Sequence, residues 1–449
     1  MGWSYPWGVA PPTSLPSWSL LEAHLPEGWR DWAKSYRILT NRKLPHNAKL
    51  KTVDEVLYLL LSYVGLGTSL RTVSAATRVT DAVPTLTSVS LHQWMRKCGP
   101  WMSQIAAAMV DPIAQVPARW HGLDVIAGDG SVITQPGSKG TDARVHYALR
   151  LSDLGYVHAE VTNPTVGEKF ERFPVAEDQL WLLDRNFCNP PAFAHALARK
   201  AHLLTRYNSG TLPLWTEAGE AFDVLQALGA LEAPGASASW SLVVRSGARR
   251  VAVRLLARRA TEEQRQKHLE RLRKDYGSMI PPRLVALAGY LLLVTTLDEK
   301  RLSTDEAFDL YRLRWQVELA IKQDKSLGGL GDLPCLLPDT IHAWLVAKIL
   351  LTLLVRRLAK QADQPAFPPC ADADEWVDCQ FPWRPTAATA PGERALASAD
   401  RCVASGASCA DVGEAGGTAT GTALLPGSPG AHRRAVPTQT DRPVSAWAG

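Results

Sequence analysis

A short apolar run that ends in an aspartate most constrains the fold of this chain. Residues 179–183 read QLWLL, and Asp184 follows directly. A continuous apolar run of this length is typical of a strand that is buried on both faces of a sheet. A proline-led helical stretch begins at residue 190, and a second strand-like run, HLLTRYN, begins at residue 202. Strands and helices in this order predict a mixed α/β sheet flanked by helices.

The residues before this run predict three further strands. GLDVIAGDGSVITQ, from residue 122, contains an apolar strand that we expect to end near Asp129. ARVHYALRLSDLGYVHAEVT, from residue 143, reads as a hairpin with its turn at residues 152–155. Gly128 and Gly130 flank Asp129, and we expect them to let a ligand approach it closely. The alternative acidic residues near the first strand are Asp124 and Asp153.

A helix far along the chain carries a third acidic residue, Glu318. Residues 290–297, YLLLVTTL, predict a buried strand, and a helix is expected over residues 303–328. The separation between Asp184 and Glu318 is too long for a simple crossover. We therefore expect an inserted, β-rich subdomain between them.

One face of the 303–328 helix gathers ionic and polar side chains. At about 100° per residue, four of them fall within a stripe about 60° wide. The apolar side is expected to pack on the sheet. A carboxylate, cations and a tyrosine on one face fit a site that holds divalent metal and a phosphodiester. The stripe contains Tyr311, Arg314, Glu318 and Lys325, and the apolar side contains Leu310, Leu313, Val317, Ala320 and Ile321.

Asp129, Asp184 and Glu318 are our candidate metal ligands. Mg2+ prefers oxygen ligands, and a pair of Mg2+ or Mn2+ ions can serve one phosphodiester site. The two aspartates can meet if their strands are neighbours, and Glu318 can reach them from a helix packed on the sheet. Each acid also has a plainer interpretation. A strand-end aspartate is commonly a turn former or helix cap, and a glutamate four residues after an arginine is commonly part of a surface pair.

Residues 1–118 predict a helical domain. Helices are expected over residues 53–67, from Ser69 onward, and as two further helices within VSLHQWMRKCGPWMSQIAAAMV, from residue 89. A short helix, a turn and a second helix with Arg96 and Lys97 would form a helix-turn-helix that contacts DNA. An ordinary helical bundle is the alternative.

Charge and composition limit the partners and the cellular compartment that we expect for this chain. The net charge of +5 permits a nucleic-acid partner, and basic residues crowd the stretch 245–274. This stretch would hold a DNA backbone, or it is a solvated charged helix. Seven scattered cysteines without a C-x-x-C pair indicate reduced thiols rather than disulfides or zinc. Because no apolar run approaches the ~20 residues of a membrane span and no signal-peptide pattern begins the chain, we expect a cytoplasmic protein without a membrane partner.

The end of the chain changes abruptly in composition. Residues 386–449 contain no Lys, Ile, Phe, Tyr or Asn and are rich in small residues. Such a segment buries too little apolar surface to order itself, so we expect residues 366–449 to be a disordered or frameshifted tail. Under the frameshift hypothesis, another reading frame of the coding DNA would encode a helical terminus, and its absence from both other frames would contradict the idea.

The stretch from Asp129 to Lys325 resembles the catalytic core of bacterial insertion-sequence DDE transposases, of the hairpin-forming cut-and-paste group marked by a YREK signature. DGSVI resembles the segment of the first aspartate, and LLDRNF resembles that of the second, where Asn186 replaces a glycine. YRLRWQVELAIKQDK matches the signature at all four positions, and VTNPTVGEKFERFP resembles the linker between the aspartates. The resemblance covers roughly residues 50 to 360.

This resemblance implies an RNase H-like core with a β-rich insertion. The parts would be DNA-binding helices at 1–118, the core at 119–208 and 290–365, and the basic insertion at 209–289. It also implies metal-dependent cleavage at transposon ends, hairpin formation and opening, and strand transfer to target DNA. The partners would be terminal inverted repeats and target DNA, bound by a homodimer on paired ends in the bacterial nucleoid. The DNA-binding residues implied are Tyr311, Arg314 and Lys325 on phosphates, Tyr290 stacked on a flipped base, and Arg249, Arg250 and Arg254 on the backbone.

Two other functions stay open at this point. The unusual tail favours a catalytically defective, DNA-binding remnant that does not synapse ends. A free-standing RNase H-like nuclease would cleave DNA but join no strands. For Tyr290, a simple role as a sheet residue is the alternative.

Overall fold

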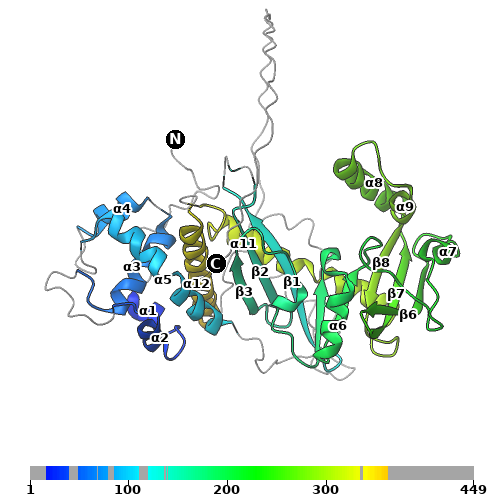
Figure 1. Cartoon of the computed structure of the whole chain (residues 1–449), viewed down its shortest axis with the longest axis horizontal. Helices are drawn as coiled ribbons and strands as arrows, with labels where there is room; N and C mark the ends of the chain where they lie inside the picture. The colour runs from blue at the N-terminus through cyan, green and yellow to red at the C-terminus, as the bar shows by residue number, and fades with distance from the viewer. Residues whose placement is uncertain are drawn as a thin grey trace, which may run out of the picture. The chain divides into compact units, whose positions relative to one another are not determined.

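The described residues of the computed structural model belong to one compact unit, which lies within Met1–Arg384. Figure 1 shows its labelled helices and strands. The predicted tail at 366–449 lies outside the residues that can be described. The structure describes residues 17–39, 49–67, 69–78, 85–110, 120–135, 138, 140–333 and 337–362.

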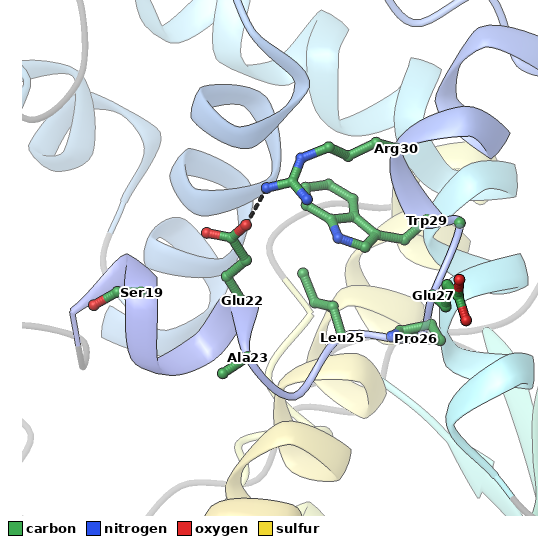
Figure 2. A pocket seen from close by; sticks show the side chains of 9 residues that line it. Ser19, Glu22, Ala23, Leu25, Pro26, Glu27, Trp29 and Arg30 are labelled. Atoms are coloured by element: carbon green, nitrogen blue, oxygen red, sulfur yellow. Dashed lines mark hydrogen bonds and ion pairs between the residues drawn. The ribbon is translucent and has the colours of Figure 1, made fainter.

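The N-terminal part of the chain is helical, as predicted. Thr52 and Glu55 form a capping box at the start of α3, and Gly67 ends that helix in a left-handed conformation. A pocket of about 440 Å³ lies where α1 turns into α2, and Figure 2 shows Arg30 reaching across it to pair with Glu22. The described helices here are α1 (Trp18–Glu22), α2 (Trp29–Ser35), α3 (Val53–Leu66), α4 (Leu70–Ala76) and α5 (Ser88–Met109).

The prediction of two helices after residue 89 is wrong, because α5 continues through Pro100. Proline removes one backbone hydrogen bond, a cost that packing against another helix can offset. That helix is α12 (Pro338–Gln361), which packs along α5 (Figure 1). At the contact, a Cβ on Gly99 would lie only 3.1 Å from the Cβ of Ala343, so the glycine permits the close approach.

Eight strands form one mixed sheet in the order β3-β2-β1-β4-β5-β8-β7-β6, which confirms the predicted fold class. β1, β4 and β5 run parallel, and the other pairs are antiparallel. The two strands of the insertion extend this same sheet. The strands are β1 (Asp124–Ile133), β2 (Ala143–Arg150), β3 (Tyr156–Thr162), β4 (Gln179–Leu183), β5 (His202–Arg206), β6 (Ser237–Ser246), β7 (Arg249–Arg259) and β8 (Tyr290–Thr295).

Helices cover both faces of the sheet around β1 and β4. On one face, Ala127 and Leu182 join the core that contains α10, α11 and α12. On the other face, Trp181 and Leu183 pack with α6 (Pro190–Ala198). Alternate residues of a strand point to opposite faces, so this division decides which strand residues face α11. The remaining helices are α7 (Val224–Leu228), α8 (Glu262–Tyr276) and α9 (Pro282–Leu287), with short 3₁₀ turns at Phe170–Arg172 and Arg185–Phe187.

The predicted helix at 303–328 is two helices, α10 (Thr304–Arg312) and α11 (Trp315–Ser326). At the joint, Arg314 N donates to Tyr311 O at 3.1 Å and Val317 N to Arg314 O at 3.3 Å. These bonds span three residues instead of four, so the chain tightens locally and the simple stripe at 100° per residue does not hold across the joint. The apolar side was predicted correctly, because Leu310, Leu313, Val317, Ala320 and Ile321 are all buried.

No helix in the described ranges combines the length and the hydropathy that a bilayer-crossing segment needs.

Candidate active site

Strand register brings Asp129 and Asp184 together. The parallel pairing of β1 with β4 ends at Gly128 opposite Leu183, and the two aspartates occupy the next position on each strand. Asp129 shares the face of Ala127, and Asp184 shares that of Leu182, so both point toward α11. β1 does not end near Asp129, as the sequence suggested, but continues to Ile133 against β2. From Asp129 onward, β1 therefore extends beyond the end of β4 and is paired with β2.

The two glycines beside Asp129 have a packing role that differs from the predicted one. A Cβ on Gly128 would lie 2.8 Å from Leu183 Cδ2, and a Cβ on Gly130 would lie 2.7 Å from the Glu168 side chain. The protein itself therefore fills the space that we had expected to admit a ligand.

The alternative acids, Asp124 and Asp153, lie away from this point. Asp124 is buried at the start of β1, where Arg150 Nε donates to it at 3.2 Å. Asp153 lies in the β2–β3 turn, where its Oδ1 accepts from the backbone of Gly155.

Burial and neighbouring carboxylates act together on Asp129. Its pKa is raised to about 7, mainly by burial; the nearby carboxylates of Glu318 and Asp184 add to the rise, while Arg314 and the Gly130 N–H oppose it. The Gly130 N–H donates to Asp129 Oδ1 at 2.8 Å. The effect of Glu318 and Asp184 on the pKa of Asp129 shows that both carboxylates lie within electrostatic reach of it.

Arg314 lies among these acids. Its guanidinium pairs with Glu318 and has Nη1 3.8 Å from Asp129 Oδ2, and its side chain is 13% exposed. In the ranges given above, no three His, Cys, Asp or Glu side chains lie close enough together to hold a metal ion. The arginine therefore supplies the positive charge between Glu318 and Asp129 in this arrangement.

The chemistry of the donor set nevertheless fits Mg2+ or Mn2+. The three carboxylates are hard oxygen donors, and Glu318 and Asp184 add negative charge beside Asp129 that a cation would balance. The Nη1 atom of Arg314 is buried without a hydrogen-bond partner, so its present position is not a fully satisfied one.

The other residues of the predicted stripe also reach this site. Tyr311 donates from its hydroxyl to the backbone oxygen of Leu183 at 3.0 Å, next to Asp184. Lys325 Nζ donates to Ser131 Oγ at 2.7 Å and to Val132 O at 2.8 Å, on the continuing part of β1. The helix joint therefore changes how the stripe is built but not which side chains it brings to the strands.

Tyr290 lies at the same edge of the sheet as Asp184. β8 runs antiparallel to β5, and β5 runs parallel to β4, so the start of β8 lies at the edge where β4 ends. The Tyr290 hydroxyl donates to Leu228 O at 3.1 Å, and the Arg259 guanidinium lies 4.6 Å from its ring centre.

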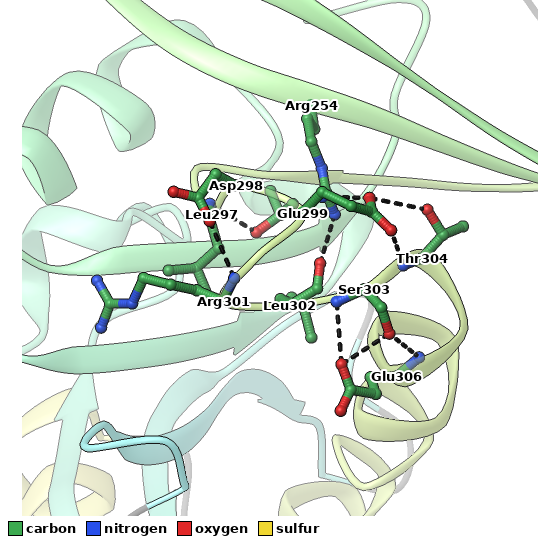
Figure 3. A network of polar contacts seen from close by, with 10 residues as sticks. Arg254, Leu297, Asp298, Glu299, Arg301, Leu302, Ser303, Thr304 and Glu306 are labelled. Atoms are coloured by element: carbon green, nitrogen blue, oxygen red, sulfur yellow. Dashed lines mark hydrogen bonds and ion pairs between the residues drawn. The ribbon is translucent and has the colours of Figure 1, made fainter.

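The three arginines expected on DNA do not share this edge. β7 runs antiparallel to β8 with Arg259 opposite Tyr290, so Arg249 and Arg250 lie at the opposite end of β7. Arg254 is 6% exposed, pairs with Glu299 and donates to Leu302 O at 2.7 Å. Figure 3 shows this side chain reaching from β7 into the loop that leads to α10. Its contacts are those of a structural residue, whereas the resemblance implied a contact with the DNA backbone.

We call the side of the sheet at which β4 ends, with Asp129 and Asp184, the acidic edge. Sequence reasoning missed three residues near this edge. Arg206 ends β5 and lies close enough to Tyr311 to lower the pKa of its hydroxyl, which burial raises. Arg259 contacts Tyr290, as described above. Trp315 follows Arg314 and is 39% exposed, with Lys322 Nζ 4.2 Å from its ring centre. Trp315 could have been found from the sequence, because it is an aromatic residue directly after Arg314. Arg206 and Arg259 could be found only once the strand register was known.

An acidic edge on an RNase H-like sheet defines a class of proteins that act on nucleic-acid phosphodiesters. Residues 141–354 match the transposase DDE domain family. The transposase for insertion sequence element IS421 of Escherichia coli is 29% identical over 352 residues, which cover 76% of this chain and 93% of that protein. Two Escherichia coli K12 proteins, named as InsL transposases for elements IS186A and IS186B, are 29% identical over 351 residues with the same coverage.

These similarities place the chain among the bacterial insertion-sequence DDE transposases. Membership implies an enzyme that cuts and rejoins DNA strands, and proteins of this family generally use divalent metal ions. The matched range contains Asp184 and Glu318, while Asp129 lies shortly before it.

Proposed function

We propose that this transposase cleaves DNA at transposon ends and transfers the strands to target DNA through Asp129, Asp184 and Glu318. The observation that carries the proposal is the placement of both aspartates at neighbouring strand positions that face Glu318. The three carboxylates would hold two Mg2+ or Mn2+ ions. When bound, such ions activate the attacking oxygen and stabilise the leaving oxygen of a phosphodiester.

The remaining stripe residues have separate roles in this proposal. Arg314 neutralises Asp129 and Glu318 before DNA binds and then turns to a DNA phosphate, because its guanidinium can pair with either kind of oxyanion. Tyr311 holds the end of β4 through Leu183 O and so fixes the backbone that presents Asp184. Lys325 contacts the far part of β1 and places a positive charge near Asp129.

The DNA surface in this proposal follows the acidic edge. Tyr290 and Trp315 offer aromatic rings to an unstacked base, and base stacking on such rings contributes about 1–3 kcal/mol. Arg206 and Arg259 would contact the backbone beside them. Arg249 and Arg250 would meet only DNA that extends to the opposite edge of the sheet.

The wider assembly also remains a proposal. We infer that residues 1–118 bind terminal inverted repeats, with the exposed Gln93 and Lys97 of α5 as base and phosphate contacts. Residues 119–208 and 290–365 would form the catalytic core, and 209–289 the basic insertion. A homodimer would act on paired ends, with the hairpin chemistry of the YREK group, in the bacterial nucleoid.

The test is cleavage of labelled terminal-repeat DNA with Mg2+ by the full chain and by the D129A, D184A and E318A variants. Each variant should bind DNA within about twofold of wild type and lose at least about 1,000-fold in cleavage rate. Nicking at the wild-type rate by a variant would remove that residue from the site. An inactive wild-type chain that binds single ends but bridges no pairs would instead support the defective remnant.

A further inference from the structure

A second carboxylate of α11 lies in the interior of the protein and takes no part in the proposed chemistry. Asp324 is 2% exposed, although an unpaired buried carboxylate is costly. It is six residues after Glu318 and directly precedes Lys325. Six residues turn a helix by about 240°, so Asp324 faces away from the acidic edge.

Contacts from two other elements hold this carboxylate. The Tyr156 hydroxyl, at the start of β3, donates to Asp324 Oδ2 at 2.8 Å. Arg356 of α12 has Nη2 3.8 Å from Asp324 Oδ1, and its guanidinium lies 4.8 Å from the centre of the Tyr156 ring. Tyr147 of β2 packs edge-on against Tyr156, with ring centres 5.2 Å apart. Asp324 thereby connects the site helix with the β2–β3 hairpin and with α12.

The elements that hold Asp324 are themselves well anchored. Arg357, next to Arg356 on α12, donates to His24 O and to Met109 O at 2.8 Å each. β3 is paired along its length with β2, which is paired with β1. The frame around Asp324 therefore includes the strand that carries Asp129.

We propose that Asp324 is a positioning residue that fixes the rotation of α11, so that Glu318 and Lys325 face β1. The effect on cleavage rests on the proposed function, whereas the fixed rotation of α11 does not. Two anchors on different faces of α11 oppose rotation about the helix axis. Lys325 on β1 provides one, and Asp324 on β3 and α12 provides the other. A displacement of about 1 Å at a reacting group can cost about 100-fold in rate.

The first experiment measures amide hydrogen exchange of the full-length protein without metal or DNA. In D324A, peptides from residues 315–326 should exchange at least about tenfold faster than in wild type, while peptides from β4 and β5 keep their protection. D324N retains an oxygen that accepts from Tyr156, so its exchange rate in these peptides should lie between those of D324A and wild type. The matched control is D153N, which removes the exposed pair between Asp153 and Lys360 of α12 and should leave α11 unchanged.

The second experiment measures single-turnover cleavage of terminal-repeat DNA at saturating DNA with Mg2+. D324A and Y156F should lower the rate by about 100-fold and about tenfold, with unchanged DNA affinity, and D324N should recover most of the loss. Wild-type exchange in α11 of D324A, or of Y156F where D324A does not fold, would overturn the proposal. So would a rate loss explained entirely by weaker DNA binding. If wild type itself does not cleave, the proposed function fails while the exchange experiment still decides the role of Asp324.

Discussion

The guanidinium of Arg314 lies 3.8 Å from the carboxylate of Asp129 while it pairs with Glu318 four residues further on. One cation thus serves two of the three acids that gather beside the end of β4. A buried carboxylate pair without a positive neighbour would be unfavourable. The same arginine is a donor that suits a phosphate, so charge balance and DNA contact fall on one side chain.

Removing this cation should destabilise the free protein. We expect R314M to lose about 2–4 kcal/mol of unfolding free energy in urea without metal, because two half-buried acids lose their partner. Addition of 10-fold excess Mg2+ over the dissociation constant should restore part of the loss, about 1.4 kcal/mol. The exposed R312M is the control and should change stability little. Equal stability of R314M and wild type in the absence of metal would contradict this explanation.

The pKa of Asp129 predicts how stability changes with pH. Because the folded-state pKa is raised to about 7 from an ordinary value of 3.8, the folded protein binds this proton more tightly than the unfolded chain does. Its contribution to stability is full below pH ~4 and is lost as the pH rises to ~7. Between these pH values, the free energy of unfolding of D129N should fall less than that of wild type, by on the order of 4 kcal/mol. Urea unfolding at several pH values, without metal, measures the difference, and parallel curves for both proteins would refute it.

The Tyr311 hydroxyl should matter through β4 and not through its own chemistry. Y311F leaves the buried Leu183 oxygen without this donor, so we expect a loss of about 1 kcal/mol in stability and about tenfold in cleavage rate. Y276F, at an exposed tyrosine of α8, serves as the control. Weaker DNA binding with an unchanged rate at saturating DNA would instead assign Tyr311 to DNA contact.

Variants of Arg254 and Arg250 should differ in stability, because Arg254 has a structural role and Arg250 lies on the surface. R254M removes the donor to Leu302 O and the cationic partner of Glu299, and we expect it to cost about 2–3 kcal/mol in urea unfolding. R250M removes one exposed hydrogen bond to Glu217 O and should cost less than about 0.5 kcal/mol. A stable R254M that binds DNA poorly would restore the interpretation that the sequence suggested.

The two ends of β7 should differ in their effect on short DNA that covers the acidic edge. Loss of the Arg259 cation should weaken binding of a short terminal-repeat duplex and lower the slope of log K against log salt by about one. R249M, at the other end of the strand, should leave both quantities unchanged. Salt titrations of R259M and R249M by fluorescence anisotropy test this, and equal slopes for the two variants would contradict the assignment of the edge.

Local patterns were sufficient for most individual elements. The run 179–183, the hairpin before it and the buried side of α10 and α11 were all predicted, because periods of two and of about 3.6 residues are visible in a short stretch of sequence. The acids and the basic stripe could also be chosen, since each lies next to such a pattern. None of this required knowledge of which strands are neighbours.

The sequence by itself therefore determined the parts of this transposase, and the tertiary structure decided how they meet. Register places Asp129 beside Asp184, and it sends Arg249 and Arg250 to the far edge while Arg259 lies beside Tyr290. Packing carries α5 through Pro100, and contacts across the fold bury Arg254 and Asp324. These outcomes depend on pairing and burial between residues far apart in the chain, and a local period contains no information about such partners.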